Sequence, residues 1–173
     1  TGAFALINNN SGDFNTATGT GALQSNMGGD GNTATGTAAL SDNTSGNNNT
    51  ANGINALFFN TTASNNTADG VNALLNNTGG NNSASGAFAL QTNGSGHDNS
   101  AQGFQALNSN TSGSNNIAIG SHAGASLTTG SNNIDLGANV QGIPGEANTI
   151  RIGKQGTQKT AFIAGIFGTP ASG

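Results

Sequence analysis

The sequence predicts an all-β protein, a β-solenoid built as a parallel β-roll of about ten coils of 16–17 residues each. Two observations predict it. A glycine returns at nearly constant spacing, and alanine, leucine and asparagine keep fixed positions relative to it. The register glycines are Gly2, Gly19, Gly36, Gly53, Gly70, Gly86, Gly103, Gly120, Gly137 and Gly153. Because a unit this short cannot bury a core alone, neighbouring coils are expected to stack and share one.

Each coil is predicted to contain a short strand just before its register glycine. Counted from that glycine as position 0, position −2 is alanine in seven successive coils, and positions −3 and −1 are polar in the first six. Such alternation, as in Thr16-Ala17-Thr18, is typical of a strand with one buried face. The preceding stretch, Gly12–Asn15 in the first coil, tolerates positive φ and predicts a turn. The coil length leaves room for two short strands and two turns, with coils about 4.8 Å apart.

The core is predicted to consist of alanine at positions −2 and +3 and leucine at position +4, which runs from Leu6 to Leu107. Asparagine at position −4 forms a further column, whose side chains can hydrogen-bond from coil to coil as a ladder. The ladder residues are Asn15, Asn32, Asn49, Asn66, Asn82, Asn99, Asn116 and Asn133. One leucine and two alanines per coil bury little apolar surface against the entropy of ordering the coil, so we expect several chains to associate.

A change of pattern near residue 117 divides the chain into three regions. Residues 1–113 are regular repeats, residues 114–153 are coils with an apolar Ile-rich face, and residues 154–173 form a cap or neck segment. At 117–119 both faces of the strand are apolar, so we expect this strand to be buried on both sides. The predicted oligomer contacts are Ile117, Ile119, Ile134, Leu136, Ile150, Ile152, Phe162 and Ile166.

Position −2 becomes charged after Ala118, where Asp135 is followed one coil later by Arg151. One coil apart, the two side chains can form a cross-strand charge pair. The alternative is two unrelated surface charges.

Composition argues against several classes of function. The formal net charge is −4 with only three Lys and Arg residues, so we expect no nucleic-acid partner. No apolar run approaches the roughly 20 residues of a membrane-spanning helix. There is no cysteine, the two histidines lie in different registers, and the seven acids are scattered. We therefore expect no metal, no cofactor, no catalytic residues and no enzyme activity.

One coil resembles a known family. The segment Asn115–Ala123 reads NNIAIGSHA and resembles the head repeat of YadA-like trimeric autotransporter adhesins, N-S-V-A-I-G-x-x-A. The resemblance implies a left-handed β-roll in which three chains pack side by side as a homotrimer. The segments Asn148–Gly153 and Thr160–Ile166 are similar to those that precede endosialidase-type intramolecular-chaperone domains in bacterial surface proteins and phage fibres.

The repeat and the resemblance together predict an extracellular structural rod, part of an adhesin or fibre on a cell surface or virion. Such a rod would give extension and attach at many points to a glycan or protein receptor on a host surface. The alternatives are the shaft of a bacteriophage tail fibre or spike and a self-stacking extracellular filament subunit. A minor alternative is an ice-binding solenoid, suggested by the Thr-x-Thr pairs at Thr16/Thr18 and Thr33/Thr35.

Overall fold

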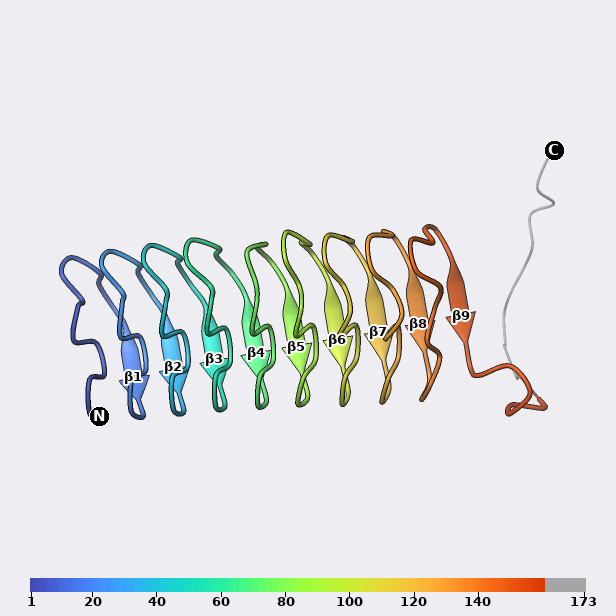
Figure 1. Ribbon diagram of the computed structural model, residues 1–173, viewed down its shortest axis with the longest axis horizontal. Helices are drawn as coiled ribbons and strands as arrows, with labels where there is room; N and C mark the ends of the chain where they lie inside the picture. The colour runs from blue at the N-terminus through green and yellow to red at the C-terminus, as the bar shows by residue number, and fades with distance from the viewer. Residues whose placement is uncertain (161–173) are drawn as a thin grey trace.

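Nine three-residue strands lie side by side along the computed structural model, which describes residues 1–160 (Figure 1). They are β1 (Thr16–Thr18), β2 (Thr33–Thr35), β3 (Thr50–Asn52), β4 (Thr67–Asp69), β5 (Ser83–Ser85), β6 (Ser100–Gln102), β7 (Ile117–Ile119), β8 (Ile134–Leu136) and β9 (Ile150–Ile152). The strands form one parallel sheet in sequence order, and the described residues contain no helix. The structure confirms the predicted all-β parallel solenoid.

Each strand forms where the alternation predicts it, directly before the register glycine. Equivalent residues pair from coil to coil, so Ala34 lies between Ala17 and Ala51. In β1–β7 the middle residue is buried and its two neighbours are exposed. The alanine column therefore faces the core, and positions −3 and −1 face outward.

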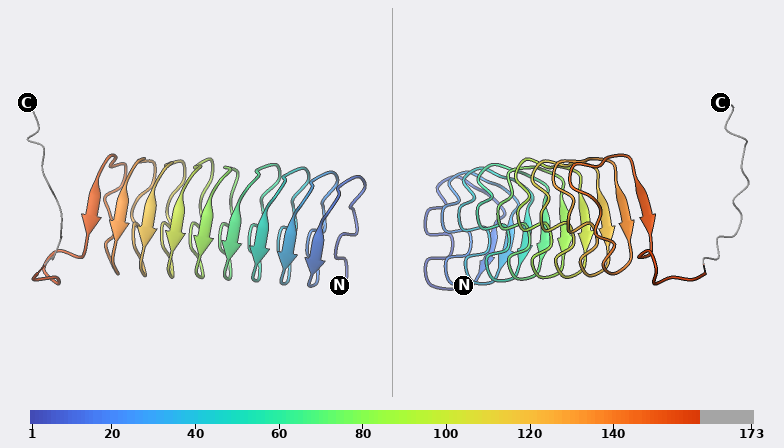
Figure 2. Two further views of the ribbon diagram at one scale, coloured as in Figure 1. Left: turned by 180° about the vertical axis from the view of Figure 1, so that it is seen from behind. Right: turned by 45° about the vertical axis from the view of Figure 1, so that its right-hand side comes forward.

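The prediction of two strands per coil is wrong, because each coil contains one (Figure 2). After the register glycine, left-handed φ angles recur at positions +2 and +4, for example 57° at Ala38 and 51° at Leu40. The N–H of Ala38 donates back to the Thr20 carbonyl (2.8 Å), whereas the N–H of Leu40 donates forward to the Ala56 carbonyl (3.0 Å). A strand needs extended backbone at every residue, so this segment joins neighbouring coils without being β-structure.

The leucine at position +4 is fully buried from Leu23 to Leu107, although its backbone is left-handed. From Leu6 to Leu107, φ lies between 49° and 54° at all seven leucines. A left-handed conformation costs a residue with a side chain about 1–2 kcal/mol. Burying a leucine side chain stabilises by about 1.5–3 kcal/mol, so the burial offsets the backbone cost.

The register glycine is required because the coils approach closely at that point. Gly36 has φ of 130°, and a Cβ atom on it would lie 2.6 Å from the carbonyl oxygen of Gly53. Neither the backbone conformation nor the space accepts another residue. The register glycine, the most regular residue of the repeat, thus marks the point of closest contact between successive coils.

The core changes composition in the coil that begins at Gly120. Gly124 stands at position +4 instead of leucine, and Leu127, three residues later, is fully buried. A Cβ atom on Gly124 would lie 2.8 Å from Leu107 Cδ2 and 3.3 Å from Leu127 Cδ1. Leu127 therefore fills the volume that the leucine at +4 fills in earlier coils, and the core continues without a gap.

Candidate interaction surface

The outward surface of the sheet consists of the residues at positions −3 and −1. In β1–β6 these residues are Thr, Ser, Asn, Asp and Gln, and all are exposed. The strands make one continuous side of the solenoid, seen from the front in the left view of Figure 2. For six coils this side presents hydroxyl, amide and carboxylate groups to solvent.

The same surface is aliphatic in β7, β8 and β9, and we call its six residues the Ile face. They are Ile117, Ile119, Ile134, Leu136, Ile150 and Ile152. The sheet register stacks them in two columns, one on each side of the central residue. Ile117 and Ile119 are 38% and 44% exposed, and Ile150 and Ile152 are 65% and 69% exposed. The described part of the chain, residues 1–160, thus leaves the Ile face accessible to water.

Burial of strand β7 on both sides, as expected from its sequence, does not occur within one chain. Ala118 is fully buried, but Ile117 and Ile119 point outward because successive side chains of a strand alternate. The core side of the strand is already filled by the alanine column. The other side is left uncovered by residues 1–160.

A buried carboxylate lies beneath the Ile face, at the position that holds alanine in the seven preceding coils. Asp135 is fully buried and is the register partner of Arg151 on the next strand. Arg151 Nη1 lies 3.8 Å from Asp135 Oδ1, and the same guanidinium donates both Nη groups to the carboxylate of Glu146. The two predicted charges are therefore neighbours. Glu146, five residues before Arg151, is a third member that sequence reasoning missed.

Burial raises the pKa of Asp135 to about 6, from an ordinary value of 3.8. The positive charge of Arg151 opposes this shift, and the negative charge of Glu146 adds to it. Neither carboxylate oxygen of Asp135 has a hydrogen-bond partner among the described residues. Hydrogen bonding to Glu146 raises the pKa of Arg151, which stays charged. The guanidinium is thus held mainly by Glu146, and Asp135 is only partly compensated.

The asparagines at position −4 form a buried ladder. The backbone N–H and the Nδ2 of Asn66 both donate to Asn49 Oδ1, at 3.0 and 3.2 Å, and Asn66 Oδ1 accepts from the N–H of Asn82 at 2.9 Å. Most of the column repeats this arrangement, and from Asn32 to Asn133 its members are buried. Each asparagine therefore satisfies a backbone donor of the next coil.

A second buried asparagine ladder stands at position +7, and sequence reasoning missed it. Its members are Asn9, Asn26, Asn43, Asn60, Asn77, Asn93 and Asn110. Each Nδ2 donates to the Oδ1 of the preceding member, at 2.6 Å from Asn110 to Asn93. The ladder ends at Asn110, whose Oδ1 has no partner because Leu127 occupies the next position. The regular spacing of asparagine at +7 was the available signal.

The two histidines do not form a site together. His97 Nδ1 lies 2.6 Å from Asp98 Oδ2 on the surface, and this hydrogen bond lowers the pKa of Asp98. His122 packs edge-on against Phe104, with ring centroids 5.3 Å apart. Within residues 1–160, no three His, Cys, Asp or Glu side chains gather in a way that could hold a metal ion. Phe162 and Ile166, two predicted contacts, lie outside the described residues.

The fold and this surface define a class of protein, a parallel β-solenoid with a polar sheet surface that ends in an apolar one. The described part of the chain has no helix with the length and apolarity to cross a membrane. No protein-family model, no curated protein and no solved structure matches this chain. Its function must therefore be argued from the surface itself.

Proposed function

We propose that the chain is the structural rod of an extracellular fibre or adhesin, without catalytic activity, and that its copies associate side by side through the Ile face. The observation that carries the proposal is the grouping of six aliphatic side chains on a sheet surface that is otherwise polar. Exposed apolar patches of this kind mark contact sites in soluble proteins.

Removal of the Ile face from water favours association of identical chains. Each side chain that starts half-buried gains about 1 kcal/mol on full burial, so the six gain on the order of 6 kcal/mol per chain. The three strands that carry the Ile face, β7, β8 and β9, lie together at one end of the solenoid in Figure 1. Parallel copies in register would bring their Ile faces to the same level, around a common axis.

A homotrimer of left-handed solenoids is the form we propose, in line with the resemblance of Asn115–Ala123 to adhesin head repeats. Three coaxial chains would make a stiffer rod than one. The sides of the three chains that face away from this axis would stay exposed, and three such sides suit weak attachment at many points to a glycan or protein receptor. A phage tail-fibre or spike shaft would use the same geometry.

The proposal is tested by measuring molecular mass in solution by sedimentation equilibrium. The variant Ile117→Ser/Ile119→Gln gives β7 the residues that β6 carries at the same positions, so the coil should still fold. We expect three chains per particle for the parent, and a shift toward monomer for the variant that deepens on dilution.

The matched control is Ile54→Thr, which removes an isoleucine that is 50% exposed and lies off the sheet. Position +1 carries threonine in the two preceding coils, at Thr20 and Thr37, so this change is also native to the repeat. The control should keep the parent mass. A parent that is monomeric throughout, or a β7 variant with unchanged mass, would contradict the proposal.

A further inference from the structure

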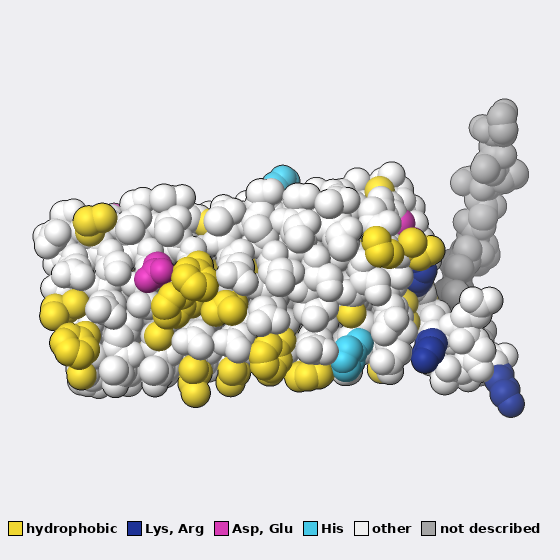
Figure 3. Space-filling view, viewed as in Figure 1, with side chains coloured by type: hydrophobic (Ala, Val, Ile, Leu, Met, Phe, Trp, Pro, Cys, Tyr) yellow, Lys and Arg dark blue, Asp and Glu magenta, His cyan; other side chains and the backbone are white. Residues whose placement is uncertain are grey.

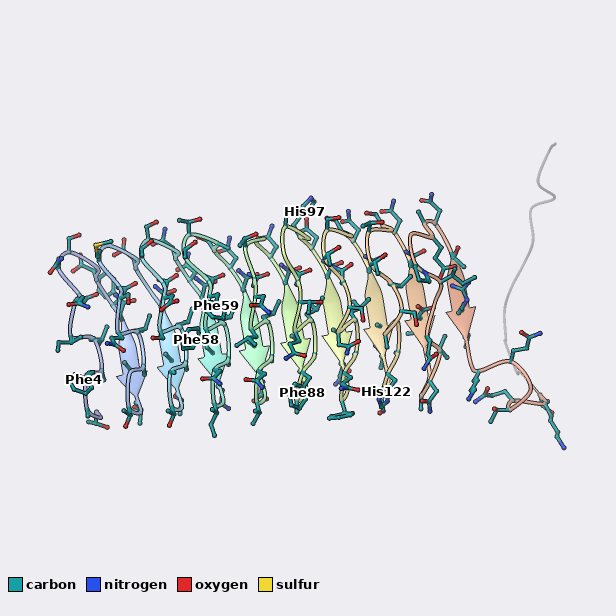
Figure 4. All side chains as sticks on the ribbon, in the orientation of Figure 1. Phe4, Phe58, Phe59, Phe88, His97 and His122 are labelled. Carbon is teal, nitrogen blue, oxygen red and sulfur yellow. The ribbon has the colours of Figure 1, made fainter. Side chains whose placement is uncertain are left out.

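A second apolar surface lies away from the sheet, on the segments that follow the register glycines of coils four and five. A small surface pocket there is lined by Asn55, Phe58, Phe59 and Leu75. The rings of Phe58 and Phe59 meet edge to face, with centroids 4.5 Å apart and planes at 70°. Figure 4 shows the two labelled rings side by side, and Phe59 is 48% exposed. We call this site the Phe58–Phe59 pocket.

The backbone holds the walls of the pocket in fixed positions. The N–H of Phe59 donates to the Leu75 carbonyl of the following coil at 3.0 Å, and the N–H of Asp42 donates to the Phe58 carbonyl at 3.0 Å. Three successive coils therefore contribute to one local surface. The pocket belongs to the rigid solenoid, so a ligand would meet it preformed.

One polar side chain, Asn55, lines the pocket, and one carboxylate, that of Asp42, stands in the preceding coil. Asn55 Nδ2 donates to Asn72 Oδ1 at 3.2 Å, which leaves Asn55 Oδ1 without a donor among the described residues. Asp42 stands at position +6, one coil before Phe59 in the same column. In Figure 3 an acidic side chain borders the central cluster of hydrophobic side chains. No lysine or arginine occurs before Arg151, so the chain itself offers this region no nearby cation.

We propose that the Phe58–Phe59 pocket binds a lysine or arginine side chain of a partner protein. The aliphatic stem of such a side chain packs on apolar walls while its charged end stays near water. Its cation is attracted to the faces of aromatic rings and to a nearby carboxylate, here that of Asp42. An anionic group would be repelled at this site, and a neutral apolar group would leave Asn55 Oδ1 and Asp42 unused.

The Ile face does not account for this pocket. The Ile face consists of strand residues at positions −3 and −1, whereas the pocket residues stand at +2, +5 and +6, on a different side of each coil. The pocket also lies three coils before β7. Association through the Ile face would leave it uncovered, so it is free for a different partner.

The test is a fluorine NMR titration of the full chain labelled with 4-fluorophenylalanine, with each ring signal assigned by single replacement. The probe is Nα-acetyl-lysine methylamide, and Nα-acetyl-norleucine methylamide is its uncharged counterpart. We expect saturable shifts of the Phe58 and Phe59 signals, with binding of the lysine probe about three- to tenfold tighter than that of norleucine. Added salt should narrow this difference.

The variant Asp42→Asn should weaken binding of the lysine probe toward the norleucine level, with the remaining preference due to the aromatic rings, and Phe59→Ser should abolish the shift at Phe58. Serine is native at position +6, at Ser25, so Phe59→Ser suits the coil. The matched control is Phe104→Ser, which removes a ring that is 45% exposed outside the pocket and installs the residue of the next coil, Ser121. This control should bind like the parent.

Three results would overturn the proposal. Equal binding of both probes would show an apolar site without charge selection. Equal shifts at Phe104 would show unspecific binding. Shifts of Phe58 and Phe59 with protein concentration alone, lost in Lys154→Gln/Lys159→Gln, would show that the occupant is a second copy of this chain.

Discussion

Asp135 and Arg151 are register partners on β8 and β9, and they replace alanine in a column that is otherwise buried and apolar. The closest approach of their side chains, 3.8 Å from Nη1 to Oδ1, is longer than a hydrogen bond. The guanidinium is engaged by Glu146, so the buried carboxylate is left without a direct donor. The last two strands of the Ile face, β8 and β9, are thus joined by an incompletely neutralised charge cluster.

The buried carboxylate predicts a stability that falls as the pH rises. The pKa of Asp135 is about 6 in the folded chain and 3.8 ordinarily. The folded state then binds the proton more tightly than the unfolded state. The stabilisation is fully present below pH 3.8 and is lost as the pH rises through 6, a difference of about 3 kcal/mol.

Denaturant unfolding at pH 4 and pH 7 of the parent and of Asp135→Ala measures this effect. The alanine variant restores the residue that the column carries in earlier coils. Its free energy of unfolding should therefore exceed that of the parent at pH 7, and this excess should shrink or change sign at pH 4. Asp69→Asn, a change on the exposed sheet surface, is the control and should follow the parent. A constant difference between Asp135→Ala and the parent at both values would refute the assignment.

The asparagine ladder predicts a large effect from one buried amide. Asn66→Ala removes the acceptor for the backbone N–H of Asn82 and the Nδ2 donor to Asn49 Oδ1, which keeps only the backbone N–H of residue 66. Buried groups left unpaired cost about 1–3 kcal/mol each, so we expect a loss of about 2–4 kcal/mol in the free energy of unfolding. The comparison is Asn76→Ala, whose amide makes one exposed hydrogen bond, to the Gln91 carbonyl. Equal losses for the two variants would mean that the ladder contributes nothing of its own.

In the coil after Gly120, glycine replaces leucine at position +4 (Gly124) and leucine replaces asparagine at position +7 (Leu127), which predicts strong coupling between the two positions. Gly124→Leu alone places a side chain into volume that Leu107 and Leu127 already fill. Leu127→Asn alone empties that volume, at a cost of about 2–5 kcal/mol for the lost leucine. The double variant carries leucine at +4 and asparagine at +7, as the earlier coils do, and the amide of the new asparagine can donate to Asn110 Oδ1.

We expect the double variant to lose less stability than the two single variants together, by about 1–3 kcal/mol in a double-mutant cycle. Thermal unfolding of the four proteins gives this coupling energy. Additive losses would show that the two positions do not share one volume.

The repeat predicted which residues stack in columns, but it did not predict the backbone conformation between the strands. The alanine column around Ala34 and the asparagine column around Asn66 follow from spacing alone, since alternation and stacking are properties of any parallel coil. The left-handed backbone at Leu40 could not be predicted, because leucine disfavours that conformation and accepts it only when burial offsets the cost. In the coil after Gly120, Leu127 fills the space that the leucine at +4 fills in earlier coils. This replacement depends on packing in three dimensions, which the spacing of residues along the sequence does not show.

The candidate site was predicted in part. The change to isoleucine at Ile117 marked the surface, and the neighbours Asp135 and Arg151 marked the charge cluster beneath it. Glu146 was missed because it stands at position −7, where the preceding coils carry glycine or alanine, so the repeat gave no sign of a charged side chain there. The Phe58–Phe59 pocket was missed because its rings stand at positions that differ from coil to coil, where a repeat carries no information.

The close contact at the register glycines has a consequence for how such a gene changes length. Because Gly36 and Gly53 make equivalent contacts, removal of residues 36–52 joins Thr35 to a glycine in the same register. Recombination between neighbouring repeats can therefore add or remove whole coils while each residue next to the junction meets the equivalent position of its new neighbour. The deletion variant should fold and show cooperative unfolding, with a particle shorter by one coil in small-angle scattering. Loss of cooperative unfolding would show that the coils are not interchangeable. Evolution can thus adjust the reach of the molecule in fixed increments without redesigning its interior.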